Sequence, residues 1–205
     1  MSTCAFILYA LKVSPDRIKR FLPEYDDYLQ RDESAVGTML RTEAGYLNEI
    51  VIWEILHSTN VCLWMDSSLQ HSQFFLNMFT KIHQRFPSHR IGIVNVQCDR
   101  DIVFERAKKR AKSTGRVVPE SDIQHSIDAV PESIEVLKDL ANVVVHIDNS
   151  FDTAFHKTPN LMQIQWNDRR ANANKPVVVD HPSWNLFHDI WTGKGPQNAS
   201  QNSKL

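Results

Sequence analysis

Two aspartates directly follow short apolar runs, a position that suits a carboxylate for chemistry. Asp66 ends the run VCLWMD and stands before Ser67 and Ser68, and Asp16 follows the run CAFILYALKV within the tripeptide SPD. An acid at the tip of a buried strand is how phosphoryl-transfer enzymes hold a magnesium-bound water or polarise a hydroxyl. Each acid also stands where a helix begins, so Asp66 has a structural explanation as a helix cap and Asp16 as a partner of the helix dipole. The structural and chemical roles can coexist.

A second feature is the basic run RAKKRAKSTGR, residues 106–116, which holds six Lys/Arg and no carboxylate. It can be a solvated helix end, an RNA-binding patch or a clamp for phosphates. Basic residues in the last turns of a helix complement the dipole and stay solvated, but Arg116 continues the charge past the predicted helix end. An RNA-binding patch usually interleaves aromatic side chains for base stacking, and this run has none.

The bulk composition makes that basic run a local feature, because 23 Lys+Arg oppose 24 Asp+Glu and the net charge is -1. A chain of 205 residues with 42% hydrophobic content is long enough to bury one substantial core. The three cysteines lack CxxC spacing and the histidines lack HxxxH or HExxH spacing beside a third ligand, so we expect no zinc site. No apolar run reaches the length of a membrane span. We therefore expect no membrane partner and a cytoplasmic protein.

Apolar runs alternate with amphipathic stretches along the first three quarters of the chain. The apolar runs predict strands at 4–13, 60–66, 90–96 and 142–148. The stretches between them predict helices at 14–22, 40–58, 70–86 and 99–113, and a helical pair at 120–128 and 131–141. The segment 23–37 is polar. In the helix 40–58 the apolar residues expected on one face are Ala44, Leu47, Ile50, Val51 and Ile55.

Strands separated by single helices, each a nearly continuous apolar run, predict an α/β fold with a three-layer parallel sheet and helices on both faces. Ligands should bind at the carboxyl ends of its strands. The pattern weakens after Asn149, where a polar stretch, 150–174, precedes one more strand in PVVVDH and a short helix in SWNLFHDIW. We expect a domain over 1–149, a C-terminal extension over 150–192 and a disordered tail over 193–205.

Four groups of segments, in order, carry a family resemblance. They are SPDRIKRFLPEY (14–25), RTEAGYLNEI (41–50), LWMDSSL (63–69) with RFPSHRIGIVNV (85–96), and RAKKRAKSTGRVVPE (106–120) followed by VPESIEVLKDLA. Together they closely resemble the zeta-toxin-like family of P-loop kinases, over roughly residues 6–149. The resemblance implies a P-loop NTPase-like fold, and as ligands ATP, Mg²⁺ and a small molecule whose hydroxyl accepts the phosphoryl group.

The resemblance also implies roles for particular residues. Asp16 is the general base that takes the proton from the acceptor hydroxyl, Glu43 lies on the substrate side, and Asp66 is the acid that serves the metal. Arg110 and Arg116 are arginines that close over the triphosphate, and Arg106 shares that role. Mobile guanidinium groups stabilise the spread negative charge of a phosphoryl-transfer transition state by about 10³–10⁵ in rate. The acceptor itself stays open, because one matched residue, Glu43, does not identify it.

The chain departs from the family at the phosphate cradle, because no GxxxxGK[ST] motif occurs in its sequence. The family's DGSLR appears as DSSLQ, with Gln70 in place of the arginine. The chain thus resembles a family member that lacks the first strand and the P-loop. Three hypotheses follow: an ATP-dependent kinase whose N-terminal segment is missing from this sequence, a noncatalytic pseudokinase or interaction protein, and an RNA-binding protein that uses residues 106–116. Nucleic acid is the least expected partner, and the oligomeric state stays undetermined.

Overall fold

The computed structural model of the protein describes residues 10–31, 39–58, 61–114, 117–150, 159–166 and 176–192. These residues form two compact units. We call the first the two-stranded unit; it holds the described residues of 2–68 and 104–126. We call the second the four-stranded unit; it holds those of 69–103 and 127–205. Two helices, α6 (Arg100–Thr114) and α7 (Glu120–Leu137), each begin in one unit and continue in the other.

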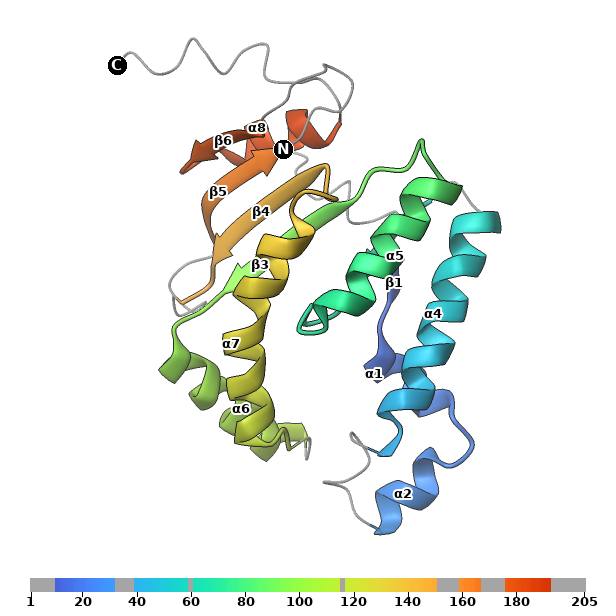
Figure 1. Cartoon of the computed structure of the whole chain (residues 1–205). Coiled ribbons are helices and arrows are strands. Elements are labelled where there is room, and N and C mark those ends of the chain that lie inside the picture. The colour runs from blue at the N-terminus through green and yellow to red at the C-terminus, as the bar shows by residue number, and fades with distance from the viewer. Residues whose placement is uncertain are drawn as a thin grey trace. The chain divides into compact units, whose positions relative to one another are not determined.

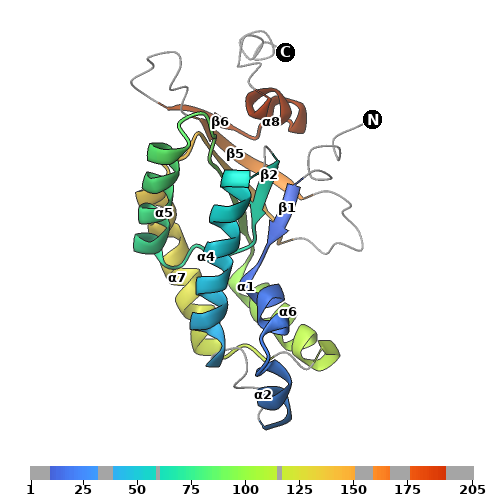
Figure 2. The same cartoon turned by 90° about the vertical axis from the view of Figure 1, so that its right-hand side faces the viewer.

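In the two-stranded unit, β1 (Ala10–Val13) and β2 (Cys62–Met65) pair in parallel (Figure 2). Helix α1 (Pro15–Ile18) begins right after β1, with proline at its first position, and runs into the 3₁₀ turn η2 (Lys19–Phe21). Proline suits that position because its missing N–H would have no partner inside the helix. The helix predicted over 14–22 is thereby confirmed. The predicted strand residues 4–9 lie outside the described residues.

The polar stretch that follows contains a helix that the sequence pattern did not predict, α2 (Tyr25–Arg31). Asp26 and Asp27 stand in its first turn and Arg31 in its last, an arrangement that complements the helix dipole at both ends. Tyr25 and Tyr28 pack against a small core of Leu22, Leu40 and Ala44. Helix α2 therefore depends on tertiary packing that its own polar sequence does not reveal.

The long predicted helix is present as α4 (Arg41–Ser58), which lies alongside α1 and both strands (Figure 2). Its predicted apolar face is confirmed at Ala44, which is buried, and is wrong at Leu47, Ile50 and Val51. The residues buried on α4 recur every four positions and are Ala44, Asn48, Ile52 and Leu56. Leu47, Ile50 and Val51 are exposed instead, and Ile55 is half-buried. The polar Asn48 is what misled the pattern, because it stands in the middle of the buried stripe.

The second sheet contains four strands in the order of the sequence (Figure 1), namely β3 (Gly92–Gln97), β4 (Val143–Asp148), β5 (Asn160–Trp166) and β6 (Val177–Asp180). Only β3 and β4 are parallel, whereas β4–β5 and β5–β6 are antiparallel. The prediction of one parallel sheet is therefore wrong. A parallel return needs a crossover of about a dozen residues or more, usually a helix, and residues 149–159 between β4 and β5 are too few.

Strand β5 lies in the stretch 150–174, for which the sequence pattern predicted no strand. Its inward residues are Leu161, Ile164 and Trp166, which face Ile147, Val145 and Val143 of β4. The register shifts between His146 and Ile147, so that Met162 has no register partner on β4. A bulge of this kind lets residues at an odd spacing face the same side. Because of the bulge, the sequence of β5 does not alternate strictly between apolar and polar residues, and the alternation pattern did not predict it.

Helices lie on both faces of the four-stranded sheet (Figures 1 and 2). On one face, α8 (Trp184–Trp191) covers a core that includes Val143, Val145 and Ile164. Ser183 caps α8 by accepting a hydrogen bond from the backbone N–H of Leu186 at 3.1 Å. Arg90 donates to the carbonyl oxygens of Trp191 at 2.7 Å and Ile190 at 3.1 Å. These contacts attach the C-terminal helix to the start of β3.

The other face carries α5 (Ser72–Arg85) and the second half of α7 (Figures 1 and 2). Helix α7 is continuous, with Pro131 inside it, so the prediction of two helices at 120–128 and 131–141 is wrong. Proline disfavours a helix interior but does not forbid it, since it removes one hydrogen bond where packing contributes more. Ser133, Ile134 and Leu137 are buried just after it.

The predicted domain boundary after residue 149 stays a prediction, and β5, β6 and α8 belong to the same unit as β3 and β4. The tail 193–205 lies outside the described residues. Among the helices of the described ranges, none is long and apolar enough to cross a membrane.

Candidate functional site

The two-stranded unit brings the ends of its parallel strands to one edge. Val13 and Met65 are register partners at the carboxyl ends of β1 and β2, and the backbone N–H of Asp66 donates to the carbonyl of Val13 at 3.0 Å. Asp66 therefore directly continues the strand pairing, and Asp16 lies three residues beyond Val13. The structure places both acids after neighbouring parallel strands at the same edge, where α/β proteins bind their ligands.

Asp66 is ion-paired, and its partner was not among the predicted residues. The ammonium Nζ of Lys12 lies 2.8 Å from Asp66 Oδ2. The two side chains are 57% and 54% exposed, respectively, so both reach solvent as well as each other. Lys12 lies in β1, within an apolar run that we interpreted only as a strand. Its only sequence signal is a basic residue in an otherwise apolar strand.

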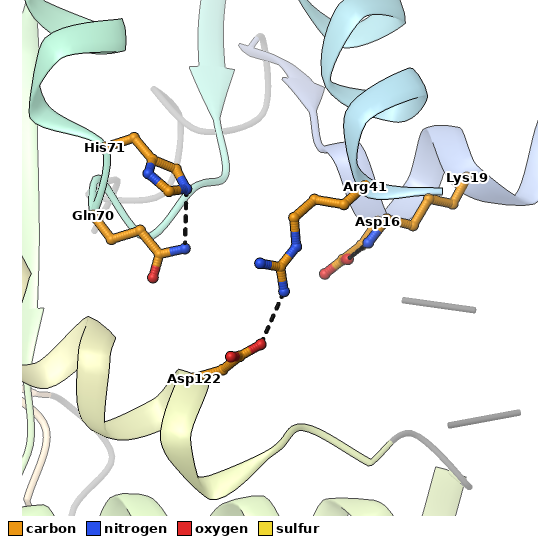
Figure 3. Close-up of polar contacts among 6 residues, drawn as sticks. All are labelled: Asp16, Lys19, Arg41, Gln70, His71 and Asp122. Atoms are coloured by element: carbon orange, nitrogen blue, oxygen red, sulfur yellow. Dashed lines mark hydrogen bonds and ion pairs between the residues drawn. The ribbon is translucent and has the colours of Figure 1, made fainter. Parts of the chain in front are cut away.

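Asp16 stands in the first turn of α1, and its Oδ1 lies 3.3 Å from Lys19 Nζ. The Lys19 side chain is mostly covered, at 13% exposed, whereas that of Asp16 is 46% exposed. The helix dipole and the ammonium both stabilise the ionised carboxylate. The carboxylate is half exposed, and Figure 3 shows it beside Lys19. Such a group can accept a hydrogen bond from a hydroxyl.

Glu43 lies exposed in the first turn of α4. Two residues before it, Arg41 begins the helix and forms an ion pair with Asp122 of α7, with Nη2 and Oδ2 2.9 Å apart (Figure 3). The pair joins residues far apart in the sequence and is about half exposed. Figure 3 shows Arg41 extending from the start of α4 towards Asp122. The sequence pattern singled out neither residue, since the signal is a contact and not a spacing.

The basic run begins within α6, whose predicted bounds, 99–113, agree with Arg100–Thr114. Arg106 is half-buried and Arg110 is exposed, one helical turn apart. The carbonyl of Arg110 accepts hydrogen bonds from the hydroxyls of Ser113 at 3.1 Å and Thr114 at 2.8 Å. These hydroxyls satisfy a carbonyl near the end of the helix. Arg116 lies outside the described residues.

One lysine of the basic run has an acidic partner. Lys108 Nζ lies 3.3 Å from Glu120 Oε1, with both side chains 68% exposed. Glu120 begins α7, just after the run. An exposed pair of this kind contributes at most about 1 kcal/mol. Lys108 therefore lies on a solvated face of α6.

Gln70 replaces the family's arginine and belongs to the four-stranded unit. Its Nε2 lies 3.4 Å from Nε2 of the neighbouring His71 (Figure 3). Leu69, just before it, has a backbone φ of 58°. That left-handed conformation is unusual for a leucine and costs on the order of 1–3 kcal/mol.

The residues present fit a metal ion poorly. Mg²⁺ is held in phosphoryl-transfer sites by one or two carboxylates together with substrate phosphates. Asp66 is the carboxylate predicted to hold the metal, but its side chain is already ion-paired with Lys12. Elsewhere in the described part of the chain, no three His, Cys, Asp or Glu residues gather to hold a metal. We therefore derive no chemistry through a metal.

The sequence matches one known protein family over most of its length. The family model described as Zeta toxin matches residues 9–160, about three quarters of the chain. This chain belongs to the Zeta toxin family. The match extends from the residue before β1 to the first residue of β5, so it includes Asp16, Glu43, Asp66 and the whole basic run. No curated protein and no solved structure matches the chain significantly.

Membership in the Zeta toxin family confirms the resemblance that the four groups of segments carried. It agrees with a kinase-like protein that handles nucleotides. The match ends where the antiparallel part of the sheet begins, so β6 and α8 lie beyond it.

Proposed function

We propose that this Zeta toxin family protein is an ATP-dependent phosphotransferase that acts on the hydroxyl group of a small molecule. One observation carries the proposal, namely that Asp16 and Asp66 follow neighbouring parallel strands at one edge of the two-stranded unit. Glu43 and the basic part of α6 belong to the same unit. Family membership supports the reaction class.

Each residue has a physical reason for its proposed role. Asp16 is half exposed and lies beside the ammonium of Lys19, so its carboxylate can accept the proton of an acceptor hydroxyl as that oxygen attacks. Glu43 is an exposed carboxylate and can orient the acceptor through a hydrogen bond. Arg106, Arg110 and Arg116 would meet the phosphate oxygens of ATP, because guanidinium groups bind phosphates through paired N–H donors. ATP brings the phosphoryl group that is transferred.

A noncatalytic nucleotide-binding protein is the second candidate. The observation that favours it is the lack of a GxxxxGK[ST] motif in the sequence. The backbone N–H groups and lysine of that motif cradle the phosphates in P-loop enzymes. In this candidate the protein binds ATP weakly but transfers no phosphoryl group.

Two variants separate these candidates. ATP binding is measured by calorimetry, and transfer from labelled ATP is measured on a panel of hydroxyl compounds that includes a UDP-linked amino sugar. Asp16→Asn should lower transfer by about 10²–10⁴, the contribution of a positioned general base, while ATP affinity changes by less than about threefold. Asp27→Asn is the control, since Asp27 is an exposed acid of α2 in the same unit. Binding without transfer to any acceptor would favour the noncatalytic candidate, and no ATP binding would refute both.

A further inference from the structure

Asp66 and Asp16 follow the carboxyl ends of β2 and β1, and of the described ion pairs there, the one between Lys12 and Asp66 is the shorter. This contact follows from the geometry of the strand pair. Lys12 pairs in register with Trp64, so the two side chains lie on the same side of the strand pair. Asp66 is two residues beyond Trp64, and successive side chains alternate along an extended chain. Asp66 therefore shares that side with Lys12, and the long lysine side chain reaches its carboxylate at 2.8 Å.

An ammonium at that distance neutralises the carboxylate. A divalent cation needs the negative charge of Asp66, and Lys12 already compensates it. A metal ion would have to displace the ammonium and would feel its repulsion if the ammonium stayed nearby. This strand end therefore carries a cation of its own, the ammonium of Lys12.

The same ammonium is well placed to meet an anion. Lys12 is 57% exposed, and an ammonium has three N–H donors on a flexible stem. Lysine binds phosphates as a point charge in phosphoryl-transfer sites. Of the cations paired with acids near this edge, Lys19 is mostly covered, at 13% exposed, and lies beside Asp16. Lys12 can therefore contact Asp66 and a phosphate oxygen together more readily than Lys19 can.

We infer that Lys12 is the built-in cation of this site, which neutralises Asp66 in place of a divalent ion and binds a phosphate oxygen of a polyphosphate ligand. The phosphate half of this inference rests on the proposed function. The neutralisation half rests on the ion pair alone.

The first experiment tests neutralisation with Mn²⁺, followed by electron paramagnetic resonance on the full chain. Lys12→Met removes the ammonium and keeps the length of the side chain, so it should tighten Mn²⁺ binding by about two- to fivefold, the range of a half-exposed ion pair. Asp66→Asn should abolish the tightening in the double variant. The control is Lys108→Met, which removes a lysine from the exposed pair with Glu120 in the same unit. Mn²⁺ binding that Lys12→Met leaves unchanged or weakens would overturn the neutralisation.

The second experiment measures binding of inorganic tripolyphosphate and of ATP by calorimetry, without metal. Lys12→Met should weaken tripolyphosphate binding by at least about threefold, and Asp66→Asn should strengthen it because the competing carboxylate is gone. Lys108→Met should change the affinity for tripolyphosphate by less than half of the change that Lys12→Met causes. Equal losses from Lys12→Met and Lys108→Met would show a diffuse electrostatic effect and overturn the phosphate contact. Circular dichroism confirms that each variant is folded.

The two proposals fail in different ways. Binding of ATP that does not depend on Lys12 would leave the proposed function standing and refute the role of Lys12. Binding of tripolyphosphate that depends on Lys12, with no binding of ATP, would support Lys12 and refute the nucleotide ligand. Binding of neither would refute the phosphate contact and the proposed function together.

Discussion

Gly92, at the start of β3, has neighbours so close that a Cβ atom there would force them to move. A Cβ atom at that position would stand 2.4 Å from Cζ3 and 2.9 Å from Cη2 of Trp191, and 3.2 Å from Cγ1 of Val143. Carbon atoms in good contact are about 3.5–4.0 Å apart. The indole of α8 would have to move by on the order of 1 Å to accept even one methyl group.

The indole is held on several sides, so that movement is costly. The guanidinium of Arg90 lies 5.9 Å from the centre of the Trp191 ring and donates to the Trp191 carbonyl at 2.7 Å. Phe187, one turn earlier, lies with its ring centre 6.4 Å from that of Trp191. We therefore expect Gly92→Ala to cost about 2 kcal/mol, within the range for adding a methyl group to a packed site. The melting temperature should fall by about 4–8 °C.

A double-mutant cycle measured by urea unfolding and circular dichroism tests this reasoning. Trp191→Ala is itself destabilising, by up to about 3 kcal/mol because the side chain is only partly buried. In that background the clash with the indole is gone and only the tight contact with Val143 is left. Gly92→Ala should then be close to neutral, because a small shift of Val143 is offset by the lower entropy of the unfolded chain. An equal cost of Gly92→Ala in both backgrounds would refute the contact with Trp191.

Gly45 provides the matched control. It lies inside α4, and a Cβ atom there would meet nothing within 4 Å. Gly45→Ala should therefore stabilise the protein by about 1 kcal/mol, the difference in helix propensity between the two residues. The same substitution thus has opposite expected signs at two positions, and only the tertiary contact distinguishes them.

Two further predictions concern polar side chains that are buried or half-buried. Burial lowers the pKa of His146, and Glu135 opposes the shift. Asn95 Nδ2 lies 3.1 Å from His146 Nδ1. The neutral His146 therefore contributes stability above its unfolded pKa of about 6.5, and this contribution is lost as the pH falls towards the folded pKa. His146→Gln should therefore lose less unfolding free energy than the wild type between pH 7.5 and 5.5 in urea titrations, and an equal loss would contradict the role of His146. Asn48 is 3% exposed and its Oδ1 has no hydrogen-bond partner among the described residues, so Asn48→Leu should raise the unfolding free energy by about 1–2 kcal/mol. A melting temperature lowered by Asn48→Leu would show that the amide has a partner there, and Asn77→Leu on the exposed side of α5 is the control.

The sequence by itself determined the local features of this protein. Strand β1, the SPD turn and helix α1 form from neighbouring residues, because an apolar run, a proline at the first helical position and an acid in the first turn each act over a few residues. The same holds for α6, whose bounds agree with the prediction within one residue. The position of Asp16 and Asp66 after strands, and the family itself, also followed from such local patterns.

Only the tertiary structure decided what depends on distant residues. The partners of Asp66 and Arg41 are Lys12 and Asp122, and neither pair has a spacing that a pattern can reveal. The buried face of α4 runs through Asn48, because neighbouring elements and not hydrophobicity alone select which residues are covered. The bulge at Met162 brings Leu161 and Ile164 to one face of an antiparallel strand, which strict alternation excludes. Long-range pairing sets the register and direction of a strand, and so it decided the mixed sheet that the local pattern predicted as parallel.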